Sequence, residues 1–166
     1  MTDTTDPSYV VRPIGRVVGG RVEAVDDDWD GVTATIELDP TMVEAGATDG
    51  LADFSHVEVV FCFDRVDEGA VCRGTRHPRG RTDWPSVGIL AQRAKDRPNR
   101  IGTTVCRVTS VGPHRIGVVG LDAVDGSPVL DVKPYLTEFG PRGPVCQPAW
   151  ATELMAGYWR ADAPVE

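Results

Sequence analysis

Three polar side chains alternate in the segment DVKPY, residues 131–135, and together they could carry acid–base chemistry. If the backbone there is extended, Asp131, Lys133 and Tyr135 project to the same side of it. The carboxylate could orient or deprotonate an acceptor, the ammonium could hold an anion, and the phenol could position the reacting group. The same residues could instead form a buried ion pair that stabilises a sheet. The spacing therefore predicts either an acceptor site or a structural ion pair.

A second candidate site is the basic turn within VGILAQRAKDRPNRIG, residues 87–102. Pro98 stiffens this turn, because it fixes its own φ and pushes Arg97 towards extended geometry. The turn gathers cations around two short polar residues: Arg93, Lys95, Arg97 and Arg100 surround Asp96 and Asn99. Such a turn suits an anion, since an arginine can grip a carboxylate or phosphate in bidentate fashion. The alternative is a solvated basic loop that ends a strand.

Short segments with period-two alternation must position these groups. Their patterns predict strands over residues 9–18, 32–38, 54–63, 87–92, 103–111, 115–121 and 128–132. The segment FSHVEVVFCF, residues 54–63, is the clearest central strand, and its His56 is expected to be a satisfied core residue. Eighteen glycines and thirteen prolines indicate many turns between short elements. We therefore expect a mainly β fold: a small closed or nearly closed β-barrel with short helices and a C-terminal helical tail.

Three irregular segments complete this expected organisation. Residues 64–84 have the composition of a mobile loop that could act as a lid. Residues 23–31, EAVDDDWDG, form either a solvated acidic turn or a recognition loop. The domain prediction is a barrel over residues 1–138 and a tail over residues 139–166, with a short helix beginning at Pro148. The tail's apolar residues are expected to dock on the barrel or on a dimer partner: Trp150, Leu154, Met155 and Tyr158 or Trp159.

Composition limits the classes of function. The 166 residues suffice for one domain with its own core, and a net charge of −8 disfavours a nucleic-acid partner. Residues 73–100 nevertheless hold eight arginines and lysines against two aspartates, so one basic face on an acidic body is possible. No segment approaches the roughly 20 apolar residues of a membrane span, and no signal peptide is evident. We expect a cytoplasmic protein without a membrane span.

The cysteines and histidines do not form a metal-binding pattern. Cys62, Cys72, Cys106 and Cys146 are far apart and make no C-x-x-C pair, so we interpret them as structural thiols in a reducing compartment. We find no His/Cys cluster with metal spacing, no nucleophile triad and no phosphate loop of the G-x-x-x-x-G-K type. The sequence therefore predicts neither a metal site nor a nucleoside triphosphate site.

Two long segments resemble the TsaA-like (TrmO) family of S-adenosylmethionine-dependent methyltransferases. The segment QRAKDRPNRIG is similar to that family's A-T-R-x-x-x-R-P-N-P-I-G signature, and GLDAVDGSPVLDVKPY is similar to L-D-x-x-D-G-T-P-V-x-D-I-K-P-Y. The resemblance implies the same barrel fold, S-adenosyl-L-methionine as cofactor and a homodimer. Residues 26–31 depart from the family pattern, because tRNA-modifying members carry a Pro-Gly loop there that helps to hold the cofactor.

The resemblance also implies a set of cofactor-contacting residues. They are Asp64, Arg65, Arg93, Thr103, Gly120, Leu121 and Asp122, while Arg97 and Asn99 are shared between cofactor contact and turn structure. Asp122 is expected to contact adenosine, and the backbone of Gly120 and Leu121 to contact the base. As alternatives, Asp64 and Arg65 are an exposed strand end, and Asp122 is only a turn former.

Two classes of function follow from the residues and the resemblance. The first is a methyltransferase that modifies threonylcarbamoyl-adenosine in tRNA, as characterised family members do, or methylates a smaller acceptor. The second is a noncatalytic module that binds an adenosine-type metabolite such as S-adenosylmethionine, or that mediates assembly. If tRNA is the substrate, the arginines of the expected lid should contact its phosphates. These are Arg73, Arg76, Arg79 and Arg81.

Overall fold

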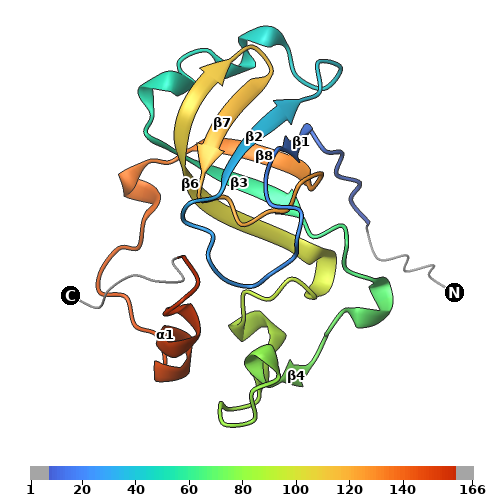
Figure 1. Cartoon of the computed structure of the whole chain (residues 1–166), viewed down its shortest axis with the longest axis vertical. Helices are drawn as coiled ribbons and strands as arrows, with labels where there is room; N and C mark the ends of the chain where they lie inside the picture. Colours follow the sequence, from blue (N-terminus) through green and yellow to red (C-terminus); the bar gives the residue numbers. More distant parts are fainter. Residues whose placement is uncertain (1–7, 160–166) are drawn as a thin grey trace, which may run out of the picture.

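The computed structural model describes residues 8–159, and its centre is a closed six-stranded barrel (Figure 1). The strands follow the order β1-β2-β7-β6-β3-β8, and all neighbours are antiparallel. Their bounds are β1 Gly15–Val18, β2 Thr33–Leu38, β3 His56–Cys62, β6 Ile101–Gly112, β7 Arg115–Val119 and β8 Pro128–Pro134. The predicted mainly β barrel is therefore confirmed.

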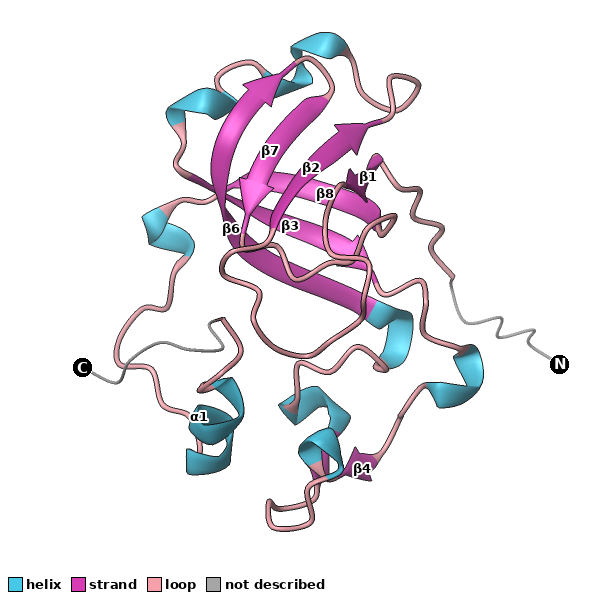
Figure 2. Ribbon diagram, in the orientation of Figure 1, coloured by secondary structure: helices cyan, strands magenta, loops and turns pink. Residues whose placement is uncertain are grey.

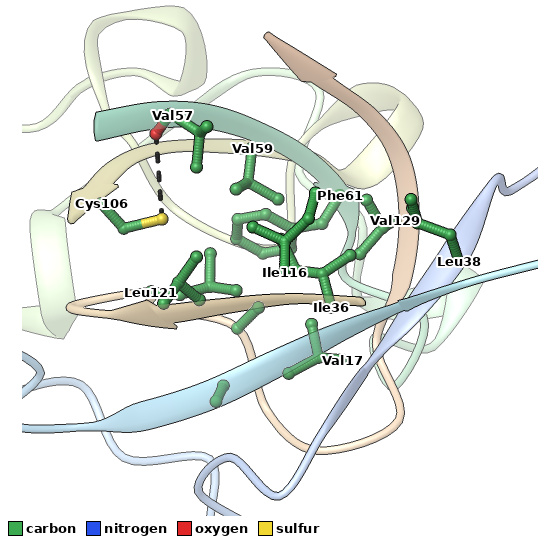
Figure 3. Close-up of a cluster of buried hydrophobic side chains, with 13 residues drawn as sticks. Val17, Ile36, Leu38, Val57, Val59, Phe61, Cys106, Ile116, Leu121 and Val129 are labelled. Atoms are coloured by element: carbon green, nitrogen blue, oxygen red, sulfur yellow. Dashed lines mark hydrogen bonds between the residues drawn. The ribbon is translucent and has the colours of Figure 1, made fainter. Parts of the chain in front are cut away.

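Alternating side chains fill the interior of the barrel. Along β3, Val57, Val59 and Phe61 are at most 1% exposed, while the residues between them are only partly covered. Figure 3 shows these side chains converging with residues from β1, β2, β6 and β7. Gly102 on β6 leaves room for the phenylalanine ring, because a Cβ there would lie 2.6 Å from the Phe61 side chain.

The long strand β6 has two different halves. From Ile101 to Arg107 it pairs with β3, and from Arg107 to Gly112 it pairs with β7. The ladder with β7 thus ends where the chain turns away at Gly120, which has a φ of +84°. Between Ile101 and Arg107, the edge of β6 that faces away from β3 is therefore bordered by irregular segments and not by a strand.

Two predicted strands differ from the structure. Residues 9–14 precede β1 outside any ladder, and only Val87–Gly88 of residues 87–92 forms a strand, β5, which pairs with β4, Thr75–Arg76. A 3-10 turn follows over Ile89–Ala91. Ile89 is buried but Leu90 is 79% exposed, so the run buries only one face. Period-two alternation over so few residues fitted a turn as well as a strand.

Residues 64–84 form successive short turns instead of an open loop, and they lie with α1 beyond one end of the barrel (Figure 2). The helix α1, Ala149–Met155, is the predicted tail helix. Trp150 on α1 stacks obliquely on Trp84 at 6.4 Å between ring centroids, and the Trp84 indole donates a hydrogen bond to Glu153 at 2.8 Å. The tail thus docks on the expected lid.

The predicted helical face is wrong in one respect. Tyr158 and Trp159 follow the end of α1 and do not share its face with Trp150. Part of the predicted tail, residues 160–166, lies outside the described residues, and the domain boundary at residue 138 stays a prediction. Within residues 8–159, no helix has the length and apolar character needed to cross a membrane.

Candidate functional site

The predicted acceptor residues lie on the outer face of the sheet formed by β6, β3 and β8. Their positions follow from the pairing register, in which Val60 on β3 is opposite both Thr103 and Asp131. Glu58 is likewise opposite Val105 and Lys133. Because the inward side chains of β3 are those of the core, these partners face outward. The strands therefore place Thr103 and the acceptor residues on one surface, about two strand spacings apart.

Asp131 and Lys133 form an ion pair on this surface. The side chains are 43% and 60% exposed, so the pair is not the buried one that the sequence left open. The Asp131 carboxylate also accepts the Val132 backbone N–H at 2.9 Å. An exposed pair of this kind contributes at most about 1 kcal/mol to stability. Both groups thus remain accessible to a bound molecule.

Tyr135 follows the end of β8 and continues the same row. Its backbone N–H donates to the His56 carbonyl at 3.0 Å, which keeps the chain beside β3. Its hydroxyl lies close to Gly140, where an added Cβ would come within 3.0 Å of the phenolic oxygen. The three predicted acceptor residues thus follow one another along the β8 edge of this face.

Three of the predicted cofactor residues gather along the first half of β6. The Arg93 guanidinium donates to the Thr103 carbonyl at 2.6 Å and to its hydroxyl at 3.3 Å. The neighbouring Thr104 hydroxyl donates to Asp122. The signature segment and the segment after β7, far apart in sequence, therefore meet at this strand.

Tyr158, from the tail, completes this group and was missed as a site residue. Its hydroxyl donates to the second oxygen of the Asp122 carboxylate at 2.5 Å. Burial raises the pKa of Tyr158 far above its ordinary value, and the nearby Asp122 charge raises it further, while Arg93 acts in the opposite direction. The sequence offered only an apolar tail pattern here, which predicted docking but gave no sign of a polar contact.

The backbone beside Asp122 suits a close approach by a flat ligand. Gly120 has a left-handed φ of +84°, and an added Cβ would have the Asp30 carbonyl at 4.0 Å as its nearest neighbour. Leu121 is fully buried and anchors this segment in the core. Leu121 can therefore offer only its backbone to a ligand.

The other predicted cofactor residues are not brought into direct contact with this group. Arg65 donates to the Val22 carbonyl at 2.8 Å and the Asp125 carbonyl at 2.6 Å, so it ties two loops together. Arg97 donates to the Gln92 carbonyl at 2.9 Å within its own turn. Asn99 has a φ of +63°, a conformation that asparagine tolerates in turns. Asp64 is exposed just after β3.

The acidic segment, residues 23–31, is exposed over most of its length, but its end is anchored to the tail. Trp29 is buried, and the backbone N–H groups of Trp29 and Asp30 donate to the Tyr158 and Trp159 carbonyls at 3.1 and 2.7 Å. Asp27 pairs with Arg79 at 2.6 Å. The acidic segment and the tail therefore form one wall, which the expected lid joins.

The basic segment is largely neutralised by its own chain. The four lid arginines each pair with a carboxylate: Arg73 with Glu68, Arg76 with Asp96, Arg79 with Asp27, and Arg81 with Asp83. Arg100 also approaches Glu68, and Lys95 lies 3.5 Å from Asp26. The charges of these residues are therefore already partly compensated by carboxylates of the same chain.

A cleft of about 500 Å³ opens on the outer face, between the barrel and the loop wall. It is lined by Asp30, His56, Val105, Cys106, Arg107, Val119, Gly120 and Trp159. His56 thus lies at the surface, half-buried on the outward side of β3, and its expected place in the core was wrong. The strand's alternation could have shown this, because His56 has the opposite parity to Val57. Among the described residues there is no cluster of three or more metal-ligating side chains.

Comparison with known proteins agrees with the geometry. Residues 27–140 match the family model described as the tRNA-methyltransferase O N-terminal domain. The Escherichia coli tRNA (adenine(37)-N6)-methyltransferase is 38% identical over 97 residues, 56% of this chain and 41% of the relative. The Pseudomonas aeruginosa protein RcsF is 38% identical over 104 residues, 63% of this chain and 43% of the relative.

Solved structures share the fold over most of the chain. A crystal structure of TrmO from P. aeruginosa superposes with a TM-score of 0.71 and 26% identity, and the match covers 89% of this chain and 64% of that one. The chain spans less than half the length of the curated relatives named above. The matched segment nevertheless contains all the barrel strands except β1, and all twelve predicted site residues. This chain therefore belongs to the family of the tRNA-methyltransferase O N-terminal domain.

Proposed function

We propose that this protein is an S-adenosyl-L-methionine-dependent methyltransferase that modifies an adenosine in tRNA. One observation carries the proposal. Arg93 and Asp122, from the two signature segments, meet along the strand whose outer face leads across β3 to Asp131 and Lys133. The names of the relatives, which include tRNA (adenine(37)-N6)-methyltransferase, support the same reading.

The gathered residues fit the proposed cofactor. A carboxylate offers about four lone-pair positions, and protein donors use one on each Asp122 oxygen. Asp122 can therefore still accept hydrogen bonds from sugar hydroxyls. The Arg93 fork uses one terminal nitrogen on Thr103 and leaves other donors for the cofactor's carboxylate. The cofactor supplies a methyl group already activated by its sulfonium, so alignment is the protein's main task.

The outer-face residues would act on the acceptor. Lys133 would hold an anionic group, Asp131 would orient the acceptor nitrogen or take its proton, and Tyr135 would position it. The exposed ion pair between Asp131 and Lys133 supports this role, because both groups can exchange partners when a substrate arrives. Asp64, Arg65, Arg97 and Asn99 remain proposed cofactor contacts that shape the surrounding loops.

A small-molecule acceptor is the second candidate substrate. The net charge of −8 and the four ion-paired lid arginines favour it over a large phosphate interface. Transfer of a labelled methyl group, measured in parallel on bulk tRNA and on a metabolite extract, decides between the two acceptors. We expect labelled tRNA at low salt. Labelled small molecules without labelled tRNA would overturn the tRNA assignment, and cofactor binding without transfer to either would leave a noncatalytic binding module.

We further propose a cytoplasmic homodimer built from a barrel over residues 1–138 and a tail over residues 139–166. Exposed apolar side chains after β8 support a second subunit there: Leu136 is 41% and Phe139 84% exposed. Free cysteines support a reducing compartment. Sedimentation should give a dimer at micromolar concentration, and a monomer at that concentration would contradict the proposal.

A further inference from the structure

The cleft beside His56 carries side chains that the predicted site does not use. The Arg107 guanidinium has no ion-pair or hydrogen-bond partner within residues 8–159 and is exposed on β6. Trp159 is 38% exposed, and Tyr158 holds its ring edge-to-face at 5.1 Å between centroids. We propose that this cleft binds one nucleotide of a single-stranded RNA segment, with the base against Trp159 and the phosphate on Arg107.

The size and lining of the cleft fit a nucleotide. Its volume of about 500 Å³ lies within the range of ordinary ligand pockets, about 300–1,000 Å³. A tryptophan fixed by its neighbour presents a rigid flat surface, on which any base can stack. Val105 and Val119 add apolar surface. This combination of one aromatic wall and one cation is typical of single-stranded nucleic-acid sites.

The charges around the cleft determine which way the nucleotide lies. Arg107 and His56 belong to the barrel wall, whereas Asp30 and Trp159 belong to the loop wall. A phosphate therefore binds on the barrel side, where Arg107 has no partner among residues 8–159 and the acidic segment is opposite. The lid arginines differ, because each already has a carboxylate partner. Arg107 is thus better placed than those arginines to neutralise a phosphate.

The pairing register connects the cleft to the proposed acceptor residues. Arg107 is opposite His56, whose carbonyl accepts the Tyr135 N–H at 3.0 Å. The adjacent row on the same face contains Glu58 and Lys133. Residues two apart on a strand are separated by about 7 Å. The inference rests on the proposed function, since it places an RNA acceptor beside the residues proposed to act on it.

Binding of unfractionated tRNA, measured by filter retention at about 50 and 200 mM salt, tests the cleft. The variant is Arg107→Ala, and the matched control is Arg115→Ala, which removes an exposed charge at the far end of β7. We expect Arg107→Ala to weaken binding and to lower the slope of log affinity against log salt by about 1. The control should leave that slope unchanged. Equal effects of the two variants would mean that only overall charge matters, and would overturn the inference.

A second variant tests the aromatic wall by an independent route. Trp159→Leu should weaken tRNA binding by about fivefold or more, since a lost stacking contact is worth about 1–3 kcal/mol. Adenosine 5′-monophosphate should compete with tRNA in the natural protein and compete less in either variant. If adenosine 5′-monophosphate binds in the cleft but neither variant changes tRNA binding, the cleft is a site for free nucleotides and the proposal that it binds RNA is wrong.

Methyl transfer separates this inference from the proposed function. Transfer to tRNA that is equally fast in the natural protein and in Arg107→Ala at limiting tRNA would refute the cleft and leave the function standing. A natural protein that binds tRNA through Arg107 but transfers no methyl group would refute the function and leave the cleft as an RNA site.

Discussion

Removing the hydroxyl of Tyr158 tests whether the tail holds Asp122 in place. Tyr158→Phe keeps the ring and deletes the donor of the 2.5 Å hydrogen bond to the carboxylate. A hydrogen bond to a charged group contributes about 1.5–3 kcal/mol, and the partly open position of Asp122 reduces this to about 1–2 kcal/mol. For a chain of this size, that loss lowers the melting temperature by about 2–8 °C.

The pH dependence gives this prediction a second, sharper test. Burial and Asp122 raise the pKa of Tyr158 in the folded state above its unfolded value of about 10. Stability from the neutral phenol is therefore fully present below pH of about 10 and is lost as the pH rises beyond it. Tyr158→Phe lacks this loss. The stability difference between the natural protein and the variant should thus be largest near neutral pH and shrink above about pH 10.

Urea unfolding at about pH 8 and about pH 10.5 measures the loss of stability and its dependence on pH. Calorimetry with S-adenosyl-L-methionine measures the effect of the substitution on cofactor binding. Tyr9→Phe is the matched control, because Tyr9 is 87% exposed and loses the same atom. We expect the control to be neutral and Tyr158→Phe to weaken cofactor binding several-fold, by about 1 kcal/mol. A variant as stable as the natural protein, or equally destabilised at both pH values, would show that the Tyr158 hydroxyl does not stabilise the fold through Asp122. Tighter cofactor binding would show that the hydroxyl competes with the ligand.

Three further predictions follow from named contacts. Gly102→Ala should lower the free energy of unfolding, measured in urea, by about 1–3 kcal/mol, because its Cβ would lie 2.6 Å from the Phe61 ring. Gly69→Ala is the control; it has open space around it and should change the free energy of unfolding by less than about 0.5 kcal/mol. Arg93→Ala should weaken cofactor binding in calorimetry, and unchanged binding would remove Arg93 from the site. Lys133→Ala should spare cofactor binding and lower turnover in the methyl-transfer assay; loss of folding would instead indicate a structural ion pair.

The barrel could be predicted because its strands obey a simple alternation. Val57, Val59 and Phe61 occupy every second position of β3, and burying them on one face fixes the strand and its register. Residues 87–92 lacked this constraint. Ile89 is the only apolar residue of that run that is buried, and its backbone N–H donates to the Gly74 carbonyl, so local turn geometry decided the outcome. Alternation over such a short segment does not distinguish a strand from a turn.

The candidate site was only partly visible in the sequence. Arg93, Thr103 and Asp122 could be proposed because two motifs carry them, although their meeting at β6 depends on barrel closure. Tyr158 and Arg107 could not be proposed from the sequence. The residues around each of them do not indicate which distant group its side chain faces. The ion pair between Arg79 and Asp27 was missed for the same reason, because the two residues are 52 positions apart. The partners of Arg73 and Arg81 lie only five and two positions away, so their ion pairs could have been proposed from the sequence.

Calorimetry with S-adenosyl-L-methionine on the natural protein and on two aspartate variants tests whether Asp122 holds the cofactor. Asp122→Asn removes the charge proposed for this role, whereas Asp125→Asn removes a nearby carboxylate whose contact is the Gly19 backbone at 2.8 Å. This role predicts saturable binding by the natural protein, a loss of about tenfold or more in Asp122→Asn, and little change in Asp125→Asn. No binding by the natural protein, or equal binding by all three proteins, would contradict it.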